Sequence, residues 1–193
     1  MSNLYPPAGL DYAEMREHEV RKVRKVMIDG NLMANTETTE GGVSSRVYHK
    51  GYWGFASIPA MDANSRDKVT RKAIDNASAM CRFGEKPPLD LAGNAYTGEQ
   101  TATQSPGLSQ QESIELMEAV DAHCKQRYPG LKSTTVILHE ESHRKGYGTT
   151  NGGSGLNIIN RAACYILMTA EDKHGKPVEL RELISDKGNL ADL

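Results

Sequence analysis

The sequence predicts an α+β fold with antiparallel β-sheets and two main helices, arranged as two lobes joined by a loop rich in glycine and proline. Three observations support this fold: runs of alternating apolar residues around short turns, two stretches with apolar residues at helical spacing, and an aperiodic stretch between them. The chain has 193 residues, of which 38% are hydrophobic and 25% charged, and its net charge is −2. This composition is typical of a globular protein. We expect no nucleic-acid partner, because acids and bases nearly balance, and no membrane association, because no apolar run reaches roughly 18 residues.

Two hairpins are expected in the first half of the chain. The first turns at Asp29-Gly30, a dipeptide that favours the positive φ angles of a two-residue turn. The second joins residues 42–48 to residues 52–58 through a glycine-containing turn at residues 50–51. Both hairpins place neighbouring strands antiparallel.

The second hairpin contains aromatic residues and glycines at informative positions. Trp53 and Phe55 recur at period two, so we expect them to be buried at the centre of the sheet. Gly51 permits the tight turn, and Gly54 permits another backbone to approach closely. Arg46, on the preceding strand, either pairs with an acidic residue or binds the carboxylate of a peptide.

Two amphipathic helices are predicted from the spacing of apolar residues. The first covers residues 65–80 and begins with a cap at Asn64-Ser65. The second begins at Ser109, which can form a capping box with Glu112 because the two side chains satisfy each other's free backbone donors.

The stretch between the helices, residues 84–107, has no periodicity of either kind and is rich in Gly, Pro, Thr, Gln and Ser. It therefore predicts a division of the chain into a lobe of residues 1–86, a linker of residues 87–107 and a lobe of residues 108–193.

The last third of the chain returns to strands. Residues 133–138 are rich in β-branched side chains, and residues 156–170 form a long apolar-rich run. A turn at residues 172–175 joins this run to a further strand at residues 177–184.

Residues 139–143, His-Glu-Glu-Ser-His, match the HExxH signature of zinc peptidases, in which two histidines bind zinc and the glutamate acts as general base. His139 and His143 are therefore candidate metal ligands, and Glu140 is a candidate catalytic base. The chemistry requires a helix, because only helical spacing directs both imidazoles at one ion. β-Branched residues precede the motif and glycines follow it, which favours an extended segment without a metal site.

The three cysteines, Cys81, Cys124 and Cys164, are an odd number and form no CxxC pair. This pattern is typical of a reducing compartment. We therefore expect a cytoplasmic protein.

Residues 42–57, GVSSRVYHKGYWGFAS, resemble the pattern of the TldD/PmbA family, also described as modulators of DNA gyrase, which is roughly G-V-x-x-R-V-x-x-x-G-x-W-G-F-A-S. The structural positions of this motif are Gly42, Gly51, Trp53, Gly54 and Phe55. The resemblance also assigns residues 11–26 to a strand, although their apolar spacing alone allows a helix or a strand.

The resemblance implies the N-terminal portion of a predicted metallopeptidase that acts in peptide processing. In that family the metal, zinc or another divalent ion, is bound by a C-terminal domain that would lie beyond Leu193. This chain would then bind no cofactor and would be inactive alone. It would contribute fold, dimer contacts and a chamber for a peptide or unfolded protein substrate. The expected partner is a TldD/PmbA-like subunit in a homo- or hetero-oligomer.

Two other functions remain open at this point. One is a self-contained zinc metallopeptidase that uses His139, Glu140 and His143, which metal content would reveal. The other is a non-catalytic binding module, which association with a metal-bearing homologue would reveal.

Overall fold

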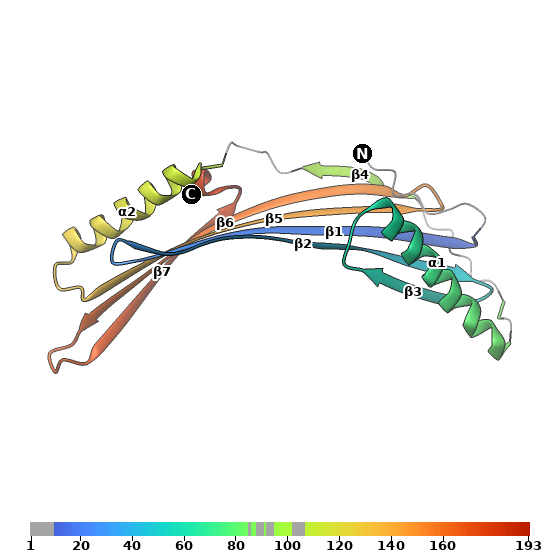
Figure 1. Ribbon diagram of the computed structural model, residues 1–193, viewed down its shortest axis with the longest axis horizontal. Coiled ribbons are helices and arrows are strands. Elements are labelled where there is room, and N and C mark those ends of the chain that lie inside the picture. Colours follow the sequence, from blue (N-terminus) through green and yellow to red (C-terminus); the bar gives the residue numbers. More distant parts are fainter. Residues whose placement is uncertain (1–9, 85, 88–90, 92–94, 102–106) are drawn as a thin grey trace. The chain divides into compact units, whose positions relative to one another are not determined.

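The computed structural model describes residues 10–84, 86–87, 91, 95–101 and 107–193. In chain order the elements are β1 (Tyr12–Ile28), β2 (Asn31–His49), β3 (Tyr52–Ile58), α1 (Ala63–Met80), η1 (Cys81–Phe83), β4 (Thr97–Thr101), α2 (Gln110–Arg127), β5 (Ser133–Thr149), β6 (Ser154–Glu171), β7 (Pro177–Lys187) and η2 (Leu190–Asp192). The predicted α+β class, with two main helices in the described chain, is confirmed (Figure 1). Neither described helix combines the length and apolarity needed to cross a membrane.

The strands form one seven-stranded sheet in the order β3-β2-β1-β5-β6-β4, and β7 also pairs with β6. β7 pairs antiparallel with residues 161–171 of β6, whereas β4 pairs in parallel with residues 154–158. The segment expected to be a loop therefore contains a strand. Its residues, Thr-Gly-Glu-Gln-Thr, carry no apolar alternation, so the strand depends on hydrogen bonds from β6 that local sequence does not predict.

The chain forms two compact units, each assembled from separate stretches of sequence. Unit 1 consists of Met1–Val20, Glu40–Thr101 and His143–Ile158, and unit 2 consists of Arg21–Thr39, Ala102–Ser142 and Ile159–Leu193. These units do not follow the order of the sequence, because β1, β2, β5 and β6, with 17, 19, 17 and 18 residues, each contribute residues to both. The division into lobes 1–86 and 108–193 with a linker at 87–107 stays a prediction.

The core of unit 1 lies between α1 and the strands β1, β2 and β3 (Figure 1). Its fully buried residues are Ala13, Met15, Val43, Val47, Val69 and Ala73. The helix begins at a different cap from the predicted one. Asp62, not Asn64-Ser65, is the N-cap, because its Oδ1 accepts the Ser65 backbone N–H at 2.9 Å and its Oδ2 accepts the Ser65 hydroxyl at 2.6 Å.

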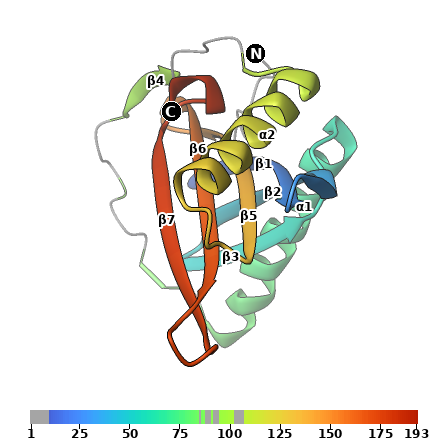
Figure 2. The same cartoon turned by 90° about the vertical axis from the view of Figure 1, so that its left-hand side faces the viewer.

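The core of unit 2 lies under α2, which covers β5 and β6 in Figure 2. Its buried residues are Met27, Met117, Val136, Leu138, Ala162, Cys164 and Leu190. The predicted capping box is confirmed: the Glu112 N–H donates to Ser109 Oγ, and the Ser109 N–H donates to Glu112 Oε2.

Both predicted hairpin turns are present. Asp29 and Gly30 have φ angles of 50° and 81°, and Lys50 and Gly51 have φ angles of 49° and 86°. Two consecutive positive φ angles define the turn that matches the twist of antiparallel strands. Gly51 therefore has the role that the sequence predicts.

Candidate functional site

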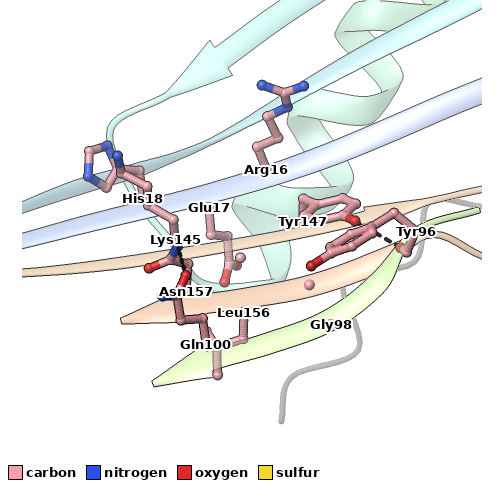
Figure 3. Close-up of a pocket in the computed structure, with 12 residues that line it drawn as sticks. Arg16, Glu17, His18, Tyr96, Gly98, Gln100, Lys145, Tyr147, Leu156 and Asn157 are labelled. Atoms are coloured by element: carbon pink, nitrogen blue, oxygen red, sulfur yellow. Dashed lines mark hydrogen bonds between the residues drawn. The ribbon is translucent and has the colours of Figure 1, made fainter. Parts of the chain in front are cut away.

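One face of the unit 1 sheet is covered by α1, and the opposite face carries a groove. On β1, Ala13 and Met15 face α1, so the alternating side chains of Arg16 and His18 point to the opposite face. There they line a groove of about 510 Å³, to which β4, β5 and β6 also contribute (Figure 3). The other residues that shape this unit 1 groove include Tyr96, Gly98, Gln100, Lys145, Tyr147, Gly155 and Asn157.

Two glycines and two tyrosines form one end of the groove. Gly98 of β4 pairs with Gly155 of β6, and a Cβ at either position would overlap the ring of Tyr96 or Tyr147 respectively. The two rings therefore lie close over glycine backbone (Figure 3). Tyr147 Oη donates to the Tyr96 carbonyl oxygen at 2.8 Å. Burial raises the pKa of the Tyr147 phenol, so this donor keeps its proton at neutral pH.

The other end of the groove is polar and positively charged. His18 Nε2 and His143 Nδ1 lie 3.3 Å apart, a hydrogen bond between imidazoles on β1 and β5. Burial, and then the charges of Lys145 and His143, lower the pKa of His18. His18 is therefore mainly neutral at pH 7. Asn157 Nδ2 donates to Gln100 Oε1 at 3.5 Å, and Asn157 Oδ1 is buried without a hydrogen-bond partner in the described chain.

An arginine and aromatic cluster lies on the same face of unit 1, beyond the groove. Arg46 donates to Glu14 Oε2 at 2.9 Å, and its guanidinium lies 4.7 Å from the centre of the Trp53 ring. Arg16 Nε lies 3.1 Å from the other oxygen of Glu14. One buried carboxylate thus holds two arginines. This contact is the structural pairing that the sequence left open for Arg46.

The prediction that Trp53 and Phe55 are buried is wrong for this chain, because they are 42% and 57% exposed. β3 is an edge strand, and the residues that it directs at α1 are Tyr52 and Gly54. A Cβ at Gly54 would overlap the backbone of Ala73 and Ala77, so the strand and the helix approach too closely for any larger residue. The period-two pattern gave the right strand but assigned the wrong face to the core.

Gly42 is also required by the close approach of another backbone. A Cβ there would lie 2.6 Å from the Ile58 carbonyl oxygen on the paired strand β3. Gly42, like Gly51 and Gly54, is therefore explained by backbone geometry.

The HExxH residues 139–143 lie within strand β5, as the sequence predicts. Glu140 Oε1 accepts the Leu190 backbone N–H at 2.9 Å, and His139 Nε2 lies 3.2 Å from Glu141 Oε1. Alternation along the strand directs Glu140 to the face opposite His139 and His143. Residues four apart in a strand are separated by about 13 Å, so the two imidazoles do not converge. These residues do not fit a zincin site, and the described chain has no group of three or more His, Cys, Asp or Glu that could hold a metal.

Sequence reasoning missed the residues of the groove. Lys145 and Tyr147 are two residues apart on one strand, and Gly155 and Asn157 are two residues apart on the next. Each pair therefore lies on a single face of its own strand, which the sequence alone can show. No local pattern predicts that β4 pairs with β6, and this pairing brings Tyr96, Gly98 and Gln100 to the site.

Residues 13–80 match the sequence family described as PmbA/TldA metallopeptidase domain 1. A search of curated protein sequences gave no match. The chain is similar in structure to a proposed modulator of DNA gyrase from Thermotoga maritima MSB8, with 16% identity and a TM-score of 0.68 over 94% of this chain and 40% of that one. It is also similar to a second proposed modulator of DNA gyrase, from Bacteroides thetaiotaomicron VPI-5482, with 16% identity and a TM-score of 0.71 over 96% of this chain and 43% of that one.

TldE from Thermococcus kodakarensis is similar at 11% identity and a TM-score of 0.56, over 92% of this chain and 40% of that one. At such identities the solved structures show a shared fold, and this chain spans about 40% of their length. Residues 13–80 are therefore of the same type as the first domain of these metallopeptidase-domain proteins. The domain match places residues 13–80 in the TldD/PmbA family, as its first domain. Over the rest of the chain the similarity to the solved structures is one of fold.

Proposed function

We propose that this chain supplies the peptide-handling part of a TldD/PmbA-type metallopeptidase that acts in peptide processing in the cytoplasm. The single observation that carries the proposal is the unit 1 groove, which lies on the sheet face that α1 leaves uncovered. A concave site of several hundred Å³, with aromatic walls and a few convergent polar groups, is typical of a ligand-binding site. In this role the chain is a binding surface rather than the source of the hydrolytic water.

The edge of the sheet beside the groove supports a peptide ligand. β4 is the last strand in the sheet order, and no strand of the described chain pairs with its outer edge. An extended peptide can pair with such an edge through main-chain hydrogen bonds, while its alternate side chains enter neighbouring pockets. Because Gly98 and Gln100 belong to β4, a peptide added there would lie beside the groove.

In this proposal the catalytic metal is not bound by residues of this chain. His139, Glu140 and His143 lie on a strand and diverge, so we derive no catalytic step through a metal in this chain. Zinc or another divalent ion is expected in the C-terminal part of the family architecture. That part comes from the same protein or from a TldD/PmbA-like subunit in a homo- or hetero-oligomer.

The test is a reconstitution of peptide hydrolysis. The purified chain, a metal-bearing TldD/PmbA subunit and their mixture are incubated with a fluorogenic peptide, and metal content is measured in each sample. We expect no hydrolysis and no stoichiometric metal for the chain alone, association on gel filtration, and faster hydrolysis by the mixture. Hydrolysis by the chain alone, with about one zinc that is lost in His139→Ala, would overturn the proposal in favour of a self-contained peptidase.

A further inference from the structure

We infer that the unit 1 groove recognises a carboxylate on the bound peptide, with Lys145 as the main charged partner and the tyrosine end holding the neighbouring residue. This inference rests on the proposed peptide-handling function and names the chemical class of the ligand. The residues that carry it lie in unit 1 and line the groove: Arg16, His18, Tyr96, Lys145, Tyr147 and Asn157.

The charges on this face favour an anion. Arg16, Arg46 and Lys145 bring three positive charges, and one of them is balanced by Glu14, which contacts both arginines. Within the described chain Lys145 has no carboxylate partner, in contrast to Arg16 and Arg46.

The other carboxylate at the groove, Glu17, is already neutralised. Arg66 Nε donates to Glu17 Oε1 at 2.5 Å, and Arg144 Nη1 lies 3.9 Å from its second oxygen. Its side chain is 2% exposed, so it presents no charge to a ligand. The accessible ionic chemistry of the groove is therefore cationic, and a lysine ammonium at the wall of a concave site attracts a carboxylate.

The polar end offers hydrogen bonds that suit the end of a peptide. Asn157 Oδ1 is buried and has no partner among the described residues, so it can accept a peptide N–H. A buried acceptor without a partner is costly, and a ligand N–H would remove that cost. Gln100 lies beside Asn157, and its Oε1 accepts a hydrogen bond from Asn157 Nδ2 at 3.5 Å.

The tyrosine end offers a flat apolar surface next to these polar groups. Tyr96 and Tyr147 both line the groove, and their rings lie next to Gly98 of β4 and Gly155 of β6 (Figure 3). A neighbouring residue with an apolar or aromatic side chain can stack there while the carboxylate binds Lys145. The groove thus combines an apolar contact and a charged contact within one site.

Binding of short peptides to the intact chain tests the inference by fluorescence anisotropy. The first probe is a hexapeptide with an N-terminal dye and a C-terminal tyrosine carboxylate, and the second is the same peptide with a C-terminal amide. A third probe is the amide peptide with glutamate as its last residue, which distinguishes a main-chain from a side-chain carboxylate. We expect the free acid, or the glutamate peptide, to bind at least about tenfold more tightly than the plain amide.

Two charge-removing variants make the result specific to the groove. Lys145→Gln should reduce the affinity of the carboxylate peptide to that of the amide peptide. Lys72→Gln is the matched control, because Lys72 is an exposed lysine on α1, which covers the other face. Thermal unfolding of both variants confirms that each is folded.

Three outcomes would overturn the inference: equal affinity for all three peptides, an equal loss in both variants, or no binding of any probe. Equal affinity at a measurable level leaves the proposed function standing, because the chain then binds peptides without reading a carboxylate. Failure of the proposed function is detected separately, by the hydrolysis and association measurements of the reconstituted mixture.

Discussion

Both units pack one helix against one face of the sheet, but they do so by opposite means. In unit 1 the helix approaches the strand so closely that Gly54 lies against the backbone of Ala73 and Ala77. In unit 2 large side chains fill the space between the helix and the strands, with Met117 fully buried in one cluster with Val136 and Leu138. Unit 1 therefore depends on the absence of side-chain volume, and unit 2 depends on its presence.

The sheet faces that the helices leave uncovered also differ between the two units. The unit 1 face carries the 510 Å³ groove with its tyrosines and polar end, and the unit 2 face carries a smaller hollow of about 370 Å³ between Arg24, His139 and Arg181. In the unit 1 groove, Gly98 of β4 and Gly155 of β6 leave the space that the rings of Tyr96 and Tyr147 occupy. Small residues thus shape both faces of unit 1, for helix packing on one side and for a site on the other.

The largest effect is expected for Gly54→Ala. The new methyl group would overlap backbone atoms, which cannot move aside as a flexible side chain can, so we expect a loss of at least about 3 kcal/mol in the free energy of unfolding, the upper end of what overpacking costs. Urea denaturation measures it. Gly130→Ala is the control, because a Cβ at Gly130 has nothing within 4 Å. Equal midpoints for the two variants would contradict close packing in unit 1.

A large-to-small substitution tests the packing of side chains in the core of unit 2. Met117→Ala removes a side chain with 0% exposure and leaves a cavity under α2, so we expect a loss of about 3 kcal/mol. Met80→Ala, at the end of α1 and 42% exposed, should change the unfolding free energy little. A comparable loss in both methionine variants would show that burial is not the cause.

Unit 1 has a charged contact between helix and sheet, from Arg66 of α1 to the buried Glu17 of β1. Arg66→Met leaves the buried carboxylate of Glu17 without its main partner. Breaking a buried pair costs roughly 3–5 kcal/mol, and because Arg66 is 20% exposed we expect about 2 kcal/mol here. Arg71→Met, an exposed arginine on the same helix, is the control. Identical denaturation curves for the two variants would mean that the pair contributes nothing.

The start of α2 offers a smaller and more local test. Ser109→Ala removes the acceptor for the Glu112 N–H and should cost about 1 kcal/mol. Ser109→Asp keeps an acceptor at the same position and should restore most of the stability. If the aspartate variant is as unstable as the alanine variant, the capping interaction is not what Ser109 contributes.

The smallest effect concerns pH. The pKa of His18 is lowered in the folded chain, by burial first and then by Lys145 and His143, so the unfolded chain binds this proton more readily. Its contribution to stability is therefore complete above about pH 6.5 and is lost as the pH falls below that value. Urea midpoints at pH 7.5 and pH 5 should differ less in His18→Gln than in the unmodified chain. A larger difference in the variant would show the opposite sign.

Much of the fold could be predicted from local sequence. Asp29-Gly30 and the turn at Gly51 determine their hairpins because few other dipeptides adopt two positive φ angles. Ser109 and Glu112 determine the start of α2 through contacts three residues apart. The extended state of residues 139–143 also followed from neighbouring residues, and it argues against a zinc site at the apparent motif.

The sequence by itself determined the two helices, the two hairpin turns and the strands other than β1 and β4, because these depend on contacts between residues close in the chain. Only the tertiary structure decided which face of β3 is buried, where β4 pairs, and that Arg16, Tyr96, Lys145 and Asn157 share one groove. The physical reason is that burial and strand pairing are decided by residues distant in sequence. Alternation along a strand shows that it has two faces, but the partner that packs against it decides which face is covered.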